Sequence, residues 1–377
     1  MADRIYLDWN ATAPLRPEAR EAMLAAMDVV GNPSSVHAEG RAAKAIVERA
    51  RGQVAALVGC AAGDVVFTSG ATEAAGLAIP EFATVSASGL EHDAVAKWVQ
   101  VDGVDLTYLL DVDPSGRLTG LARGQPLEAA IWDDMVAVQA ANSETGVLQD
   151  TARFAERLRE LDRGVLVLVD AVQAVGKVPF SFPWSGADYA MISAHKLGGP
   201  KGTGALLVKP GRDVAPRIRG GGQELGRRSG TENVIGIAGF GAACEAAGRD
   251  LSSGVWEAVE KLRNILETAL ASGTKDTIFV GKEAPRLPNT TCFATPGWKG
   301  ETQVMQMDLA GFAVSSGSAC SSGKVKTPRV LRAMGLDDRA AEGALRVSLG
   351  PTNTEDEVLR FAEAWLRHEK KFRQRAA

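Results

Sequence analysis

The segment from Ala190 to Ala205, AMISAHKLGGPKGTGA, places a histidine and a lysine where an apolar run meets a glycine-rich turn. Such a turn holds Lys196 at the edge of a predicted sheet with little side-chain crowding around it. Asp170 follows an earlier apolar run, VLVLV at 165–169. A pyridoxal phosphate (PLP) site needs a lysine that forms a Schiff base with the cofactor aldehyde and an acid that pairs with the protonated pyridine nitrogen. The two residues therefore indicate PLP chemistry, although either one alone also fits an ordinary turn.

Cys320 lies in a polar, glycine-rich segment, SSGSACSSGK, that is unlike a packed core. Lys324 and Lys326 follow closely, and nearby cations favour the thiolate form of a cysteine. The segment predicts a mobile loop whose cysteine is either incidental or a nucleophile. The four cysteines form no CxxC pair, so neither a disulfide framework nor a zinc site is indicated. Three of them have apolar or small neighbours and are predicted to be packed thiols: Cys60, Cys244 and Cys292.

Thr72 belongs to TSGATE, at 68–73, where a strand-like run passes through small residues into a predicted helix. The free N–H groups of a helix start, together with a threonine hydroxyl, form a seat for a phosphate group. The same residues also describe a simple capped helix start, with Ser or Thr at the cap and Glu following. Both interpretations stay open on this motif alone.

The elements that position these residues can be read from the apolar pattern. Helical periodicity dominates from Pro17 to Gly59 and is broken at 32–35, where Ser34 or Ser35 is expected to cap the second helix. Mostly continuous apolar runs then alternate with helical patterns, which predicts an α/β fold with a mainly parallel sheet covered on both faces. The predicted strands are 65–68, 106–110, 135–139, 165–169, 189–193 and 205–208.

The pattern changes after about Glu245 and predicts a smaller α+β unit. A helix is expected at 256–271 and another from about Glu355, with strands near 277–280, 290–294 and 344–349. A chain of 377 residues is longer than one core usually serves. We therefore expect a large PLP-binding domain at 15–245, and a small domain, formed by 1–14 and 246–377, that carries the Cys320 loop.

The bulk composition limits the partners. A net charge of −4 makes no case for a nucleic-acid partner, and the basic residues at 368–375 fit a solvated helix end. The N-terminus has no apolar signal region. The longest notable apolar run, 234–244, has eleven residues and is too short to span a bilayer. The expectation is a cytoplasmic protein without membrane contact.

Ten motifs from Tyr6 to Gly350 carry a family resemblance. They occur in the same order as in the cysteine desulfurases, PLP enzymes of aminotransferase class V and fold-type I, which the chain therefore resembles. The resemblance is to the long-cysteine-loop branch, which includes nitrogen-fixation and iron–sulfur enzymes. It implies a large domain with a mainly parallel, seven-stranded-type sheet flanked by helices, plus a smaller α+β domain. The motifs are YLDWNATAP, GNPSSVHAEGR, FTSGATEA, LEHDAV, SETGVLQD, VDAVQAVGK, SAHKLGGPKGTGAL, GGGQELGRRSGTEN, SSGSAC and LRVSLG.

The resemblance implies roles around the cofactor ring. Lys196 matches the Schiff-base lysine and Asp170 the partner of the pyridinium nitrogen. Gln173 matches the donor to the phenolic oxygen, and His92 the histidine that stacks on the ring and moves protons. Ser143 stands where relatives place a ring-contacting asparagine, and the neighbouring Asn142 would substitute for it only if the backbone shifted.

The resemblance also implies the phosphate and substrate contacts. Arg346 matches the residue that clamps the substrate carboxylate, a bidentate task suited to a guanidinium. Thr231 matches a phosphate contact delivered from a second subunit, which implies a homodimer. The phosphate contacts within one subunit are Ala71, through its backbone N–H, Thr72, Ser193 and His195.

Cys320 matches the nucleophile that takes sulfur from L-cysteine, leaving L-alanine and a persulfide for a sulfur-acceptor protein. The chain stops soon after its last predicted helix, without the extension that housekeeping members use to dock a scaffold. The acceptor is therefore open between an iron–sulfur scaffold and a thiolation or molybdenum-cofactor protein.

Other functions remain to be weighed. A selenocysteine lyase or a C–S lyase would need Lys196 and Asp170 but not Cys320. A non-catalytic scaffold of the same fold is disfavoured because the full set of chemical residues is intact. A nucleotide-binding α/β protein is disfavoured because no GxGxxG or P-loop motif follows a predicted strand.

Overall fold

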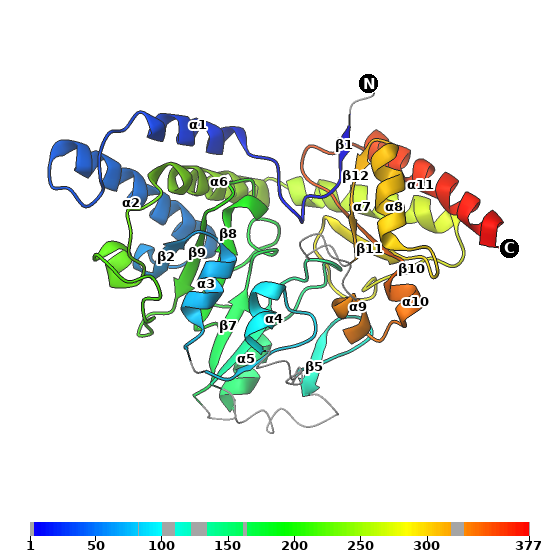
Figure 1. Ribbon diagram of the computed structural model, residues 1–377, viewed down its shortest axis with the longest axis horizontal. Coiled ribbons are helices and arrows are strands. Elements are labelled where there is room, and N and C mark those ends of the chain that lie inside the picture. Colours follow the sequence, from blue (N-terminus) through cyan, green and yellow to red (C-terminus); the bar gives the residue numbers. More distant parts are fainter. Residues whose placement is uncertain are drawn as a thin grey trace.

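The computed structural model describes residues 4–81, 83–99, 110–121, 134–160, 164–317 and 328–376. A mixed sheet in the order β2-β9-β8-β7-β6-β3 lies at the centre of the larger part of the molecule (Figure 1). Within it only β9 runs against the others, so the expected mainly parallel α/β sheet is confirmed. Its strands are β2 (Val65–Thr68), β3 (Val85–Ser86), β6 (Met135–Gln139), β7 (Leu166–Asp170), β8 (Tyr189–Ser193) and β9 (Gly204–Val208).

The strand expected at 106–110 lies outside the described residues except for Leu110, which forms a parallel bridge with Ser88. From Leu110 the chain enters a small antiparallel hairpin of β4 (Leu110–Val112) and β5 (Leu118–Leu121). The other predicted strands of this sheet agree with the structure to within one residue at either end.

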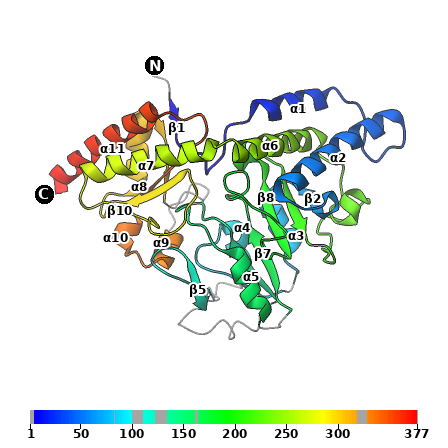
Figure 2. The same cartoon turned by 180° about the vertical axis from the view of Figure 1, so that it is seen from behind.

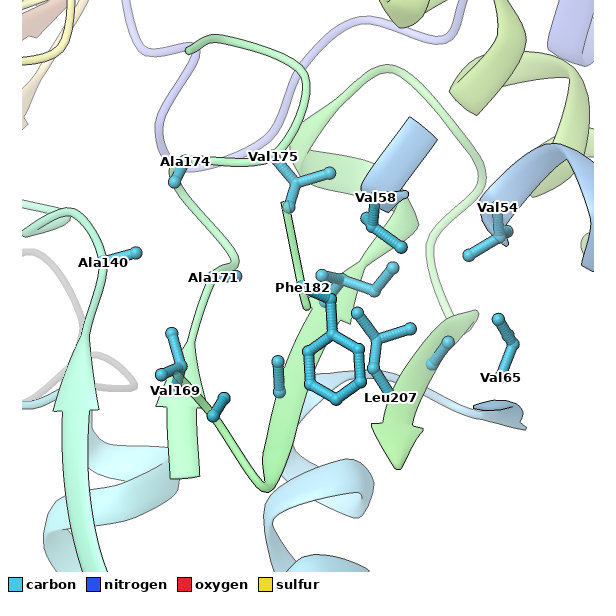
Figure 3. Close-up of a cluster of buried hydrophobic side chains, with 14 of the residues drawn as sticks. Val54, Val58, Val65, Ala140, Val169, Ala171, Ala174, Val175, Phe182 and Leu207 are labelled. Carbon is cyan, nitrogen blue, oxygen red and sulfur yellow. The ribbon is translucent and has the colours of Figure 1, made fainter. Parts of the chain in front are cut away.

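Helices cover both faces of the sheet because alternate side chains point to opposite faces and nearly all of them are apolar. Val65 packs in the core beneath α2 and α6, whereas its neighbour Val66 packs on the opposite face against α3. Figure 3 shows Val54 and Val58 of α2 close to Leu207 of β9. The first face carries α1 (Pro17–Met27), α2 (Ala38–Val58), α5 (Thr151–Glu160) and α6 (Val234–Ser252); the second carries α3 (Ala71–Ala78) and α4 (Asp93–Val99).

The expected cap of α2 at Ser34 or Ser35 is wrong. The N-cap is His37, whose Nδ1 accepts from the Gly40 N–H. Ser34 and Ser35 instead form a turn on Asn32, which takes their N–H groups on its side-chain and backbone oxygens. An asparagine that bonds the backbone two residues on competes with a helix start, so the helix begins later.

The C-terminal residues build a second core around an antiparallel sheet in the order β10-β11-β14-β13. Figure 2 shows α7 and α11 side by side over this part of the molecule. Buried aromatic residues such as Phe293 and Trp365 fill it, in contact at 5.1 Å between ring centroids. Its strands are β10 (Ile278–Phe279), β11 (Thr290–Ala294), β13 (Ser315–Ser316) and β14 (Ala344–Ser348), and its helices α7 (Val255–Gly273), α8 (Gly300–Leu309), α9 (Arg329–Ala333), α10 (Asp338–Ala341) and α11 (Glu355–Ala376).

The N-terminus belongs to this second core. Strand β1 (Ile5–Tyr6) pairs in parallel with β12 (Phe312–Ala313), more than three hundred residues away in sequence. From there the chain crosses towards the larger sheet before α1 begins. The boundaries proposed for the two domains remain a prediction. Among the described residues, no helix is both long and apolar enough to cross a membrane.

Candidate active site

The carboxyl ends of β2, β3, β6, β7 and β8 meet at one edge of the central sheet, because these strands point the same way. This edge is where open α/β sheets bind ligands. A cavity of about 560 Å³ lies there. Its lining includes most of the predicted site residues: Ala71, Thr72, His92, Ser143, Asp170, Gln173, Ser193, His195 and Lys196.

Lys196 enters the cavity from η4 (Ala194–Lys196), the short 3-10 helix that follows β8. Its Nζ donates to the carbonyl oxygens of Asn10 at 2.7 Å and Ala11 at 3.0 Å. Gly198, two residues on, has a φ of 89°, a backbone conformation that a residue with a Cβ rarely adopts. The glycine turn therefore lets the chain reverse immediately behind the lysine.

Asp170 is the last residue of β7 and is only 8% exposed. One of its carboxylate oxygens accepts the Val172 N–H at 2.9 Å. Burial raises the pKa of the Asp170 carboxyl above its ordinary value, and the nearby His92 and Lys196 oppose this shift. A protonated pyridine nitrogen would provide a close positive partner for the charged form. The site therefore fits the ring end of PLP.

His92 lies between β3 and α4 on the wall of the cavity. Its Nδ1 accepts the Ala94 N–H at 3.1 Å, so the neutral ring carries its proton on Nε2. Burial lowers the pKa of His92 below 6.5, and Asp170 acts in the opposite direction. Near neutral pH the ring is therefore suited to exchange a proton as the uncharged imidazole.

The predicted phosphate seat lies at the start of α3. Gly70 is the N-cap, and it has no side chain with which to bond the N–H groups of the first turn. Glu73 instead accepts the Ser69 N–H at 2.6 Å and pairs with Arg228 at 2.8 Å. The first turn thus keeps N–H groups for an anion, and the interpretation of TSGATE as only a capped helix start is not supported.

His195 lies at the same end of the cavity. Its Nδ1 is 3.2 Å from the Thr12 hydroxyl oxygen. Burial, with a further contribution from Lys196, lowers the pKa of His195 to about 4. It is therefore neutral at physiological pH and suited to a hydrogen bond rather than to a charge contact with phosphate.

Asn142 and Ser143 take different positions relative to the cavity. Ser143 lines the cavity, whereas Asn142 is buried in the adjoining turn and does not line it. The Asn142 Oδ1 accepts the N–H groups of Glu144 and Thr145, and its Nδ2 donates to the Leu90 carbonyl. These bonds engage both ends of the Asn142 amide, so in this backbone it does not substitute for Ser143.

Arg346 lies behind the cavity rather than in its lining. It is 1% exposed on β14. Its Nη2 pairs with Asp8 at 2.6 Å, and its Nη1 donates to the Ser143 carbonyl at 2.9 Å. The guanidinium therefore lies behind Ser143, which does line the cavity. Thr231 is exposed and is not among the cavity-lining residues of its own chain.

Cys320 lies outside the described residues, but the chain is described again from residue 328, and there it lies near the site. Arg329, at the start of α9, donates to the backbone carbonyls of Gly89 and Glu91. It also pairs with Asp93 at 3.3 Å. The chain just downstream of the Cys320 segment therefore contacts the turn that carries His92.

Several residues in or beside the cavity were not identified from the sequence. Asn10 and Thr12 reach Lys196 and His195 from the N-terminal segment. Gln139 lines the cavity beside Asp170, its partner in strand register. Lys177 lies buried next to Gln173. The one available signal for Lys177 was its spacing of four residues from Gln173, a common spacing for contact in a tight turn or helix.

Comparisons with known proteins agree with the fold and the site. The model of the family "Aminotransferase class-V" matches residues 5–361. The chain is 39% identical over 366 residues to a cysteine desulfurase of Enterobacter agglomerans, covering 94% of this chain and 90% of that protein. It is 40% identical over 374 residues to a cysteine desulfurase of Cereibacter sphaeroides, covering 96% of this chain and 94% of that protein. A NifS-like protein from Rickettsia africae has a similar structure, with a TM-score of 0.88, 32% identity and coverage of 97% and 99%.

Fold and cavity together define a PLP-dependent enzyme of fold-type I. The chain belongs to the aminotransferase class-V family, with the cysteine desulfurases as its relatives. The resemblance seen in the ten motifs is thereby confirmed.

Proposed function

We propose that the protein is an L-cysteine desulfurase that releases L-alanine and retains the sulfur as a persulfide on Cys320. The observation that carries this proposal is the convergence of Lys196, Asp170 and His92 on one cavity at the carboxyl edge of the sheet. Bound PLP supplies a sink for the electrons released at the substrate Cα.

Lys196 is the proposed point of attachment for the cofactor. Whenever the Lys196 Nζ is not attached to the cofactor, the carbonyl oxygens of Asn10 and Ala11 would hold it at the edge of the cavity. Asp170 would hold the ring nitrogen of PLP in its protonated form, and His92 would exchange a proton with the substrate through Nε2. Thr72, Ser193 and His195 would hold the phosphate at the start of α3.

Cys320 is the proposed acceptor of the sulfur atom. Its thiolate attacks the substrate sulfur, so that an S–S bond forms while the substrate C–S bond breaks. The carbon fragment retains the electron pair of the broken bond and takes up a proton to become alanine. Arg329 supports this role, because it ties the chain just downstream of the Cys320 segment to the turn that carries His92.

Arg346 is the proposed clamp for the substrate carboxylate. Its guanidinium is already oriented by Asp8 and by the Ser143 carbonyl. A carboxylate that enters beside Ser143 would exchange with one of these two bonds. The proposed recipient of the persulfide sulfur is an acceptor protein, either an iron–sulfur scaffold or a thiolation or molybdenum-cofactor protein.

We also propose that the protein is a homodimer in which Thr231 of one subunit contacts the phosphate seat of the other. Leu225, in the same loop, is 81% exposed. Glu224 and Leu225 have φ of 49° and 58°, conformations that are strained for such side chains. Further apolar side chains exposed around α1 and the turn that follows it are Leu24, Met27, Val30 and Val36.

Two substitutions test the proposed chemistry. Lys196→Ala should remove the covalent link to PLP, so that the cofactor is lost on gel filtration. Cys320→Ala should keep PLP, with an unchanged visible absorption, but release sulfide from L-cysteine at least a hundredfold more slowly than the parent, because it lacks the acceptor thiol. Sulfide release at the parent rate by Cys320→Ala would refute the persulfide route and favour a C–S lyase or selenocysteine lyase.

A further inference from the structure

Lys177 is an unexpected component of the cofactor site. It follows β7 in a turn, where a lysine is expected to face solvent, yet it is only 3% exposed. Its Nζ donates to the side-chain oxygen of Asn10 at 2.9 Å and to Oε1 of Gln173 at 2.5 Å. No carboxylate of the described part of the chain forms a salt bridge with it. Both of its bonded partners are neutral amides.

The contacts of Lys177 decide which way the Gln173 amide points. The lysine donates to the amide oxygen, so Oε1 is the atom that faces it. On the other side, Gln173 Nε2 donates to the Asn10 carbonyl at 3.0 Å. A flipped amide would set its Oε1 against the Asn10 carbonyl oxygen, an acceptor facing an acceptor, and would turn its NH2 group towards the Lys177 Nζ, which now donates to Oε1. Asn10 and Lys177 therefore favour the same orientation.

The orientation matters because Gln173 lines the cavity. Its NH2 group has two hydrogens, and the bond to Asn10 uses one of them. The same carbonyl of Asn10 also receives Nζ of Lys196. The Asn10 carbonyl oxygen thus accepts hydrogen bonds from both Lys196 and Gln173.

We propose that Lys177 is a positioning residue that fixes the Gln173 amide with its NH2 group available to donate a hydrogen bond to bound PLP. This inference rests on the proposed cofactor site and adds to it a residue that does not touch the cavity. The same side chain also ties Asn10 to the turn after β7.

The cost of this arrangement indicates that the amine itself is needed. Burial, followed by the proximity of Lys196 and Arg346, lowers the pKa of Lys177 well below its ordinary value. Burial without a carboxylate partner disfavours the charged form, but the neutral amine still has N–H groups to donate to both amides. A methionine of similar length would fill the space without a buried polar group, but it could not orient Gln173.

A double-mutant cycle tests the proposal. Lys177→Met, Gln173→Met and the double variant are prepared as apo-proteins, and the PLP dissociation constant of each is measured by titration. Each single substitution should raise this constant about tenfold, the effect of one hydrogen bond made or oriented in a buried site. The double variant should show little further loss, because Lys177 acts through Gln173.

Arg263→Met is the matched control for the loss of a buried basic side chain. Arg263 is 6% exposed and donates to the Leu287 carbonyl at 2.7 Å, and it does not line the cavity. Its replacement should lower the unfolding temperature of the apo-protein and leave the PLP dissociation constant within twofold of the parent. If Lys177→Met does not fold, Lys177→Ala enters the same cycle, since it also removes the donor to Gln173.

The outcomes separate the inference from the proposed function. Unchanged PLP binding in Lys177→Met, or a hundredfold loss in the double variant through additive effects, would overturn the role of Lys177. A parent protein that binds no PLP would instead refute the cofactor site on which the inference rests.

Discussion

At the scale of single residues, burial controls the protonation of the site. The pKa of Glu91, which precedes His92, is raised to about 8 by complete burial and then by the proximity of Asp170. One of its carboxyl oxygens accepts from the Ser88 hydroxyl and the Gln139 N–H. Glu91 is therefore protonated at neutral pH, which keeps a second negative charge away from Asp170.

The pH dependence of stability should reveal this buried proton. The folded apo-protein keeps the Glu91 proton up to about pH 8, whereas an unfolded chain releases it near 4.5. Unfolding between these values releases a proton, so Glu91 lowers stability as pH rises. Glu91→Gln should remove this effect. The difference in unfolding free energy between Glu91→Gln and the parent should therefore grow, in favour of the variant, by up to about 1.4 kcal/mol for each pH unit in that window.

Urea unfolding of both apo-proteins at pH 5, 6, 7 and 8 measures the difference. Asp170 and His92 are present in both proteins, so their titrations largely cancel. A difference in unfolding free energy that is constant with pH would show that Glu91 is ionised in the folded protein.

Three of the residues that sequence reasoning found, Asp170, Lys196 and Thr72, lie next to a recognisable strand end. Asp170 and Lys196 follow apolar runs, and Thr72 follows a strand and opens a helix. Asn10 and Lys177 had no such signal, because their roles depend on hydrogen bonds between segments 167 residues apart. Local pattern contains no information on that contact. The resemblance placed Arg346 in a substrate role, but its pairing with Asp8 became visible only in the structure.

At the scale of elements, the site depends on how closely the strand ends approach one another. The backbone of β9 passes the start of α3 at Gly204. A Cβ added there would lie 2.7 Å from the Gly70 Cα and 2.7 Å from the Ile192 carbonyl oxygen. Both neighbours are backbone atoms and cannot move aside alone, so the proposed phosphate seat requires a glycine on the adjacent strand.

Gly204→Ala should therefore damage stability and cofactor binding together. We expect a loss of about 1–3 kcal/mol in unfolding free energy from overpacking, and weaker PLP binding because the start of α3 is displaced. Gly52→Ala is the control: it lies within α2, and no described atom would come within 4 Å of the added Cβ. That substitution should stabilise the protein by up to about 1 kcal/mol. Equal stability of Gly204→Ala and the parent would contradict the close approach.

The N-terminal segment is the element whose role was least predictable. The Ala13 N–H donates to the His195 carbonyl and the Arg16 N–H to that of Gly198. The segment therefore lies along the turn that carries Lys196. Its composition, neither helical nor alternating, identifies no element type, so the sequence indicated a motif there but not its position in space. The strands, in contrast, were predictable because continuous apolar runs are typical of a doubly covered sheet.

At the scale of the whole molecule, two hydrophobic cores meet around the N-terminal segment. The amide of Asn10 donates to Thr290 of β11, and its N–H donates to Ser348 of β14. The same residue contacts Lys177, Gln173 and Lys196 of the larger part. Asn10 thus connects the core of the C-terminal sheet to the proposed cofactor cavity.

The proposed dimer can be tested at this scale through Leu225. Leu225→Asn suits the left-handed backbone conformation at this position and removes the exposed apolar side chain. The dimer dissociation constant should rise about tenfold, the effect of exposing one buried leucine. Leu309→Asn, at a side chain that is 84% exposed on α8, should leave it unchanged. Sedimentation velocity over a concentration series measures both, and a monomeric parent would contradict the dimer.

The most direct measurement of the central claim is the product balance with L-cysteine. Purified, PLP-loaded protein is incubated with L-cysteine and a thiol reductant, and alanine, sulfide, pyruvate and ammonia are quantified over time. A desulfurase should form alanine and sulfide in equal amounts over many turnovers, because the reductant releases each persulfide from Cys320. Formation of pyruvate and ammonia in place of alanine would contradict the proposed function and identify a C–S lyase.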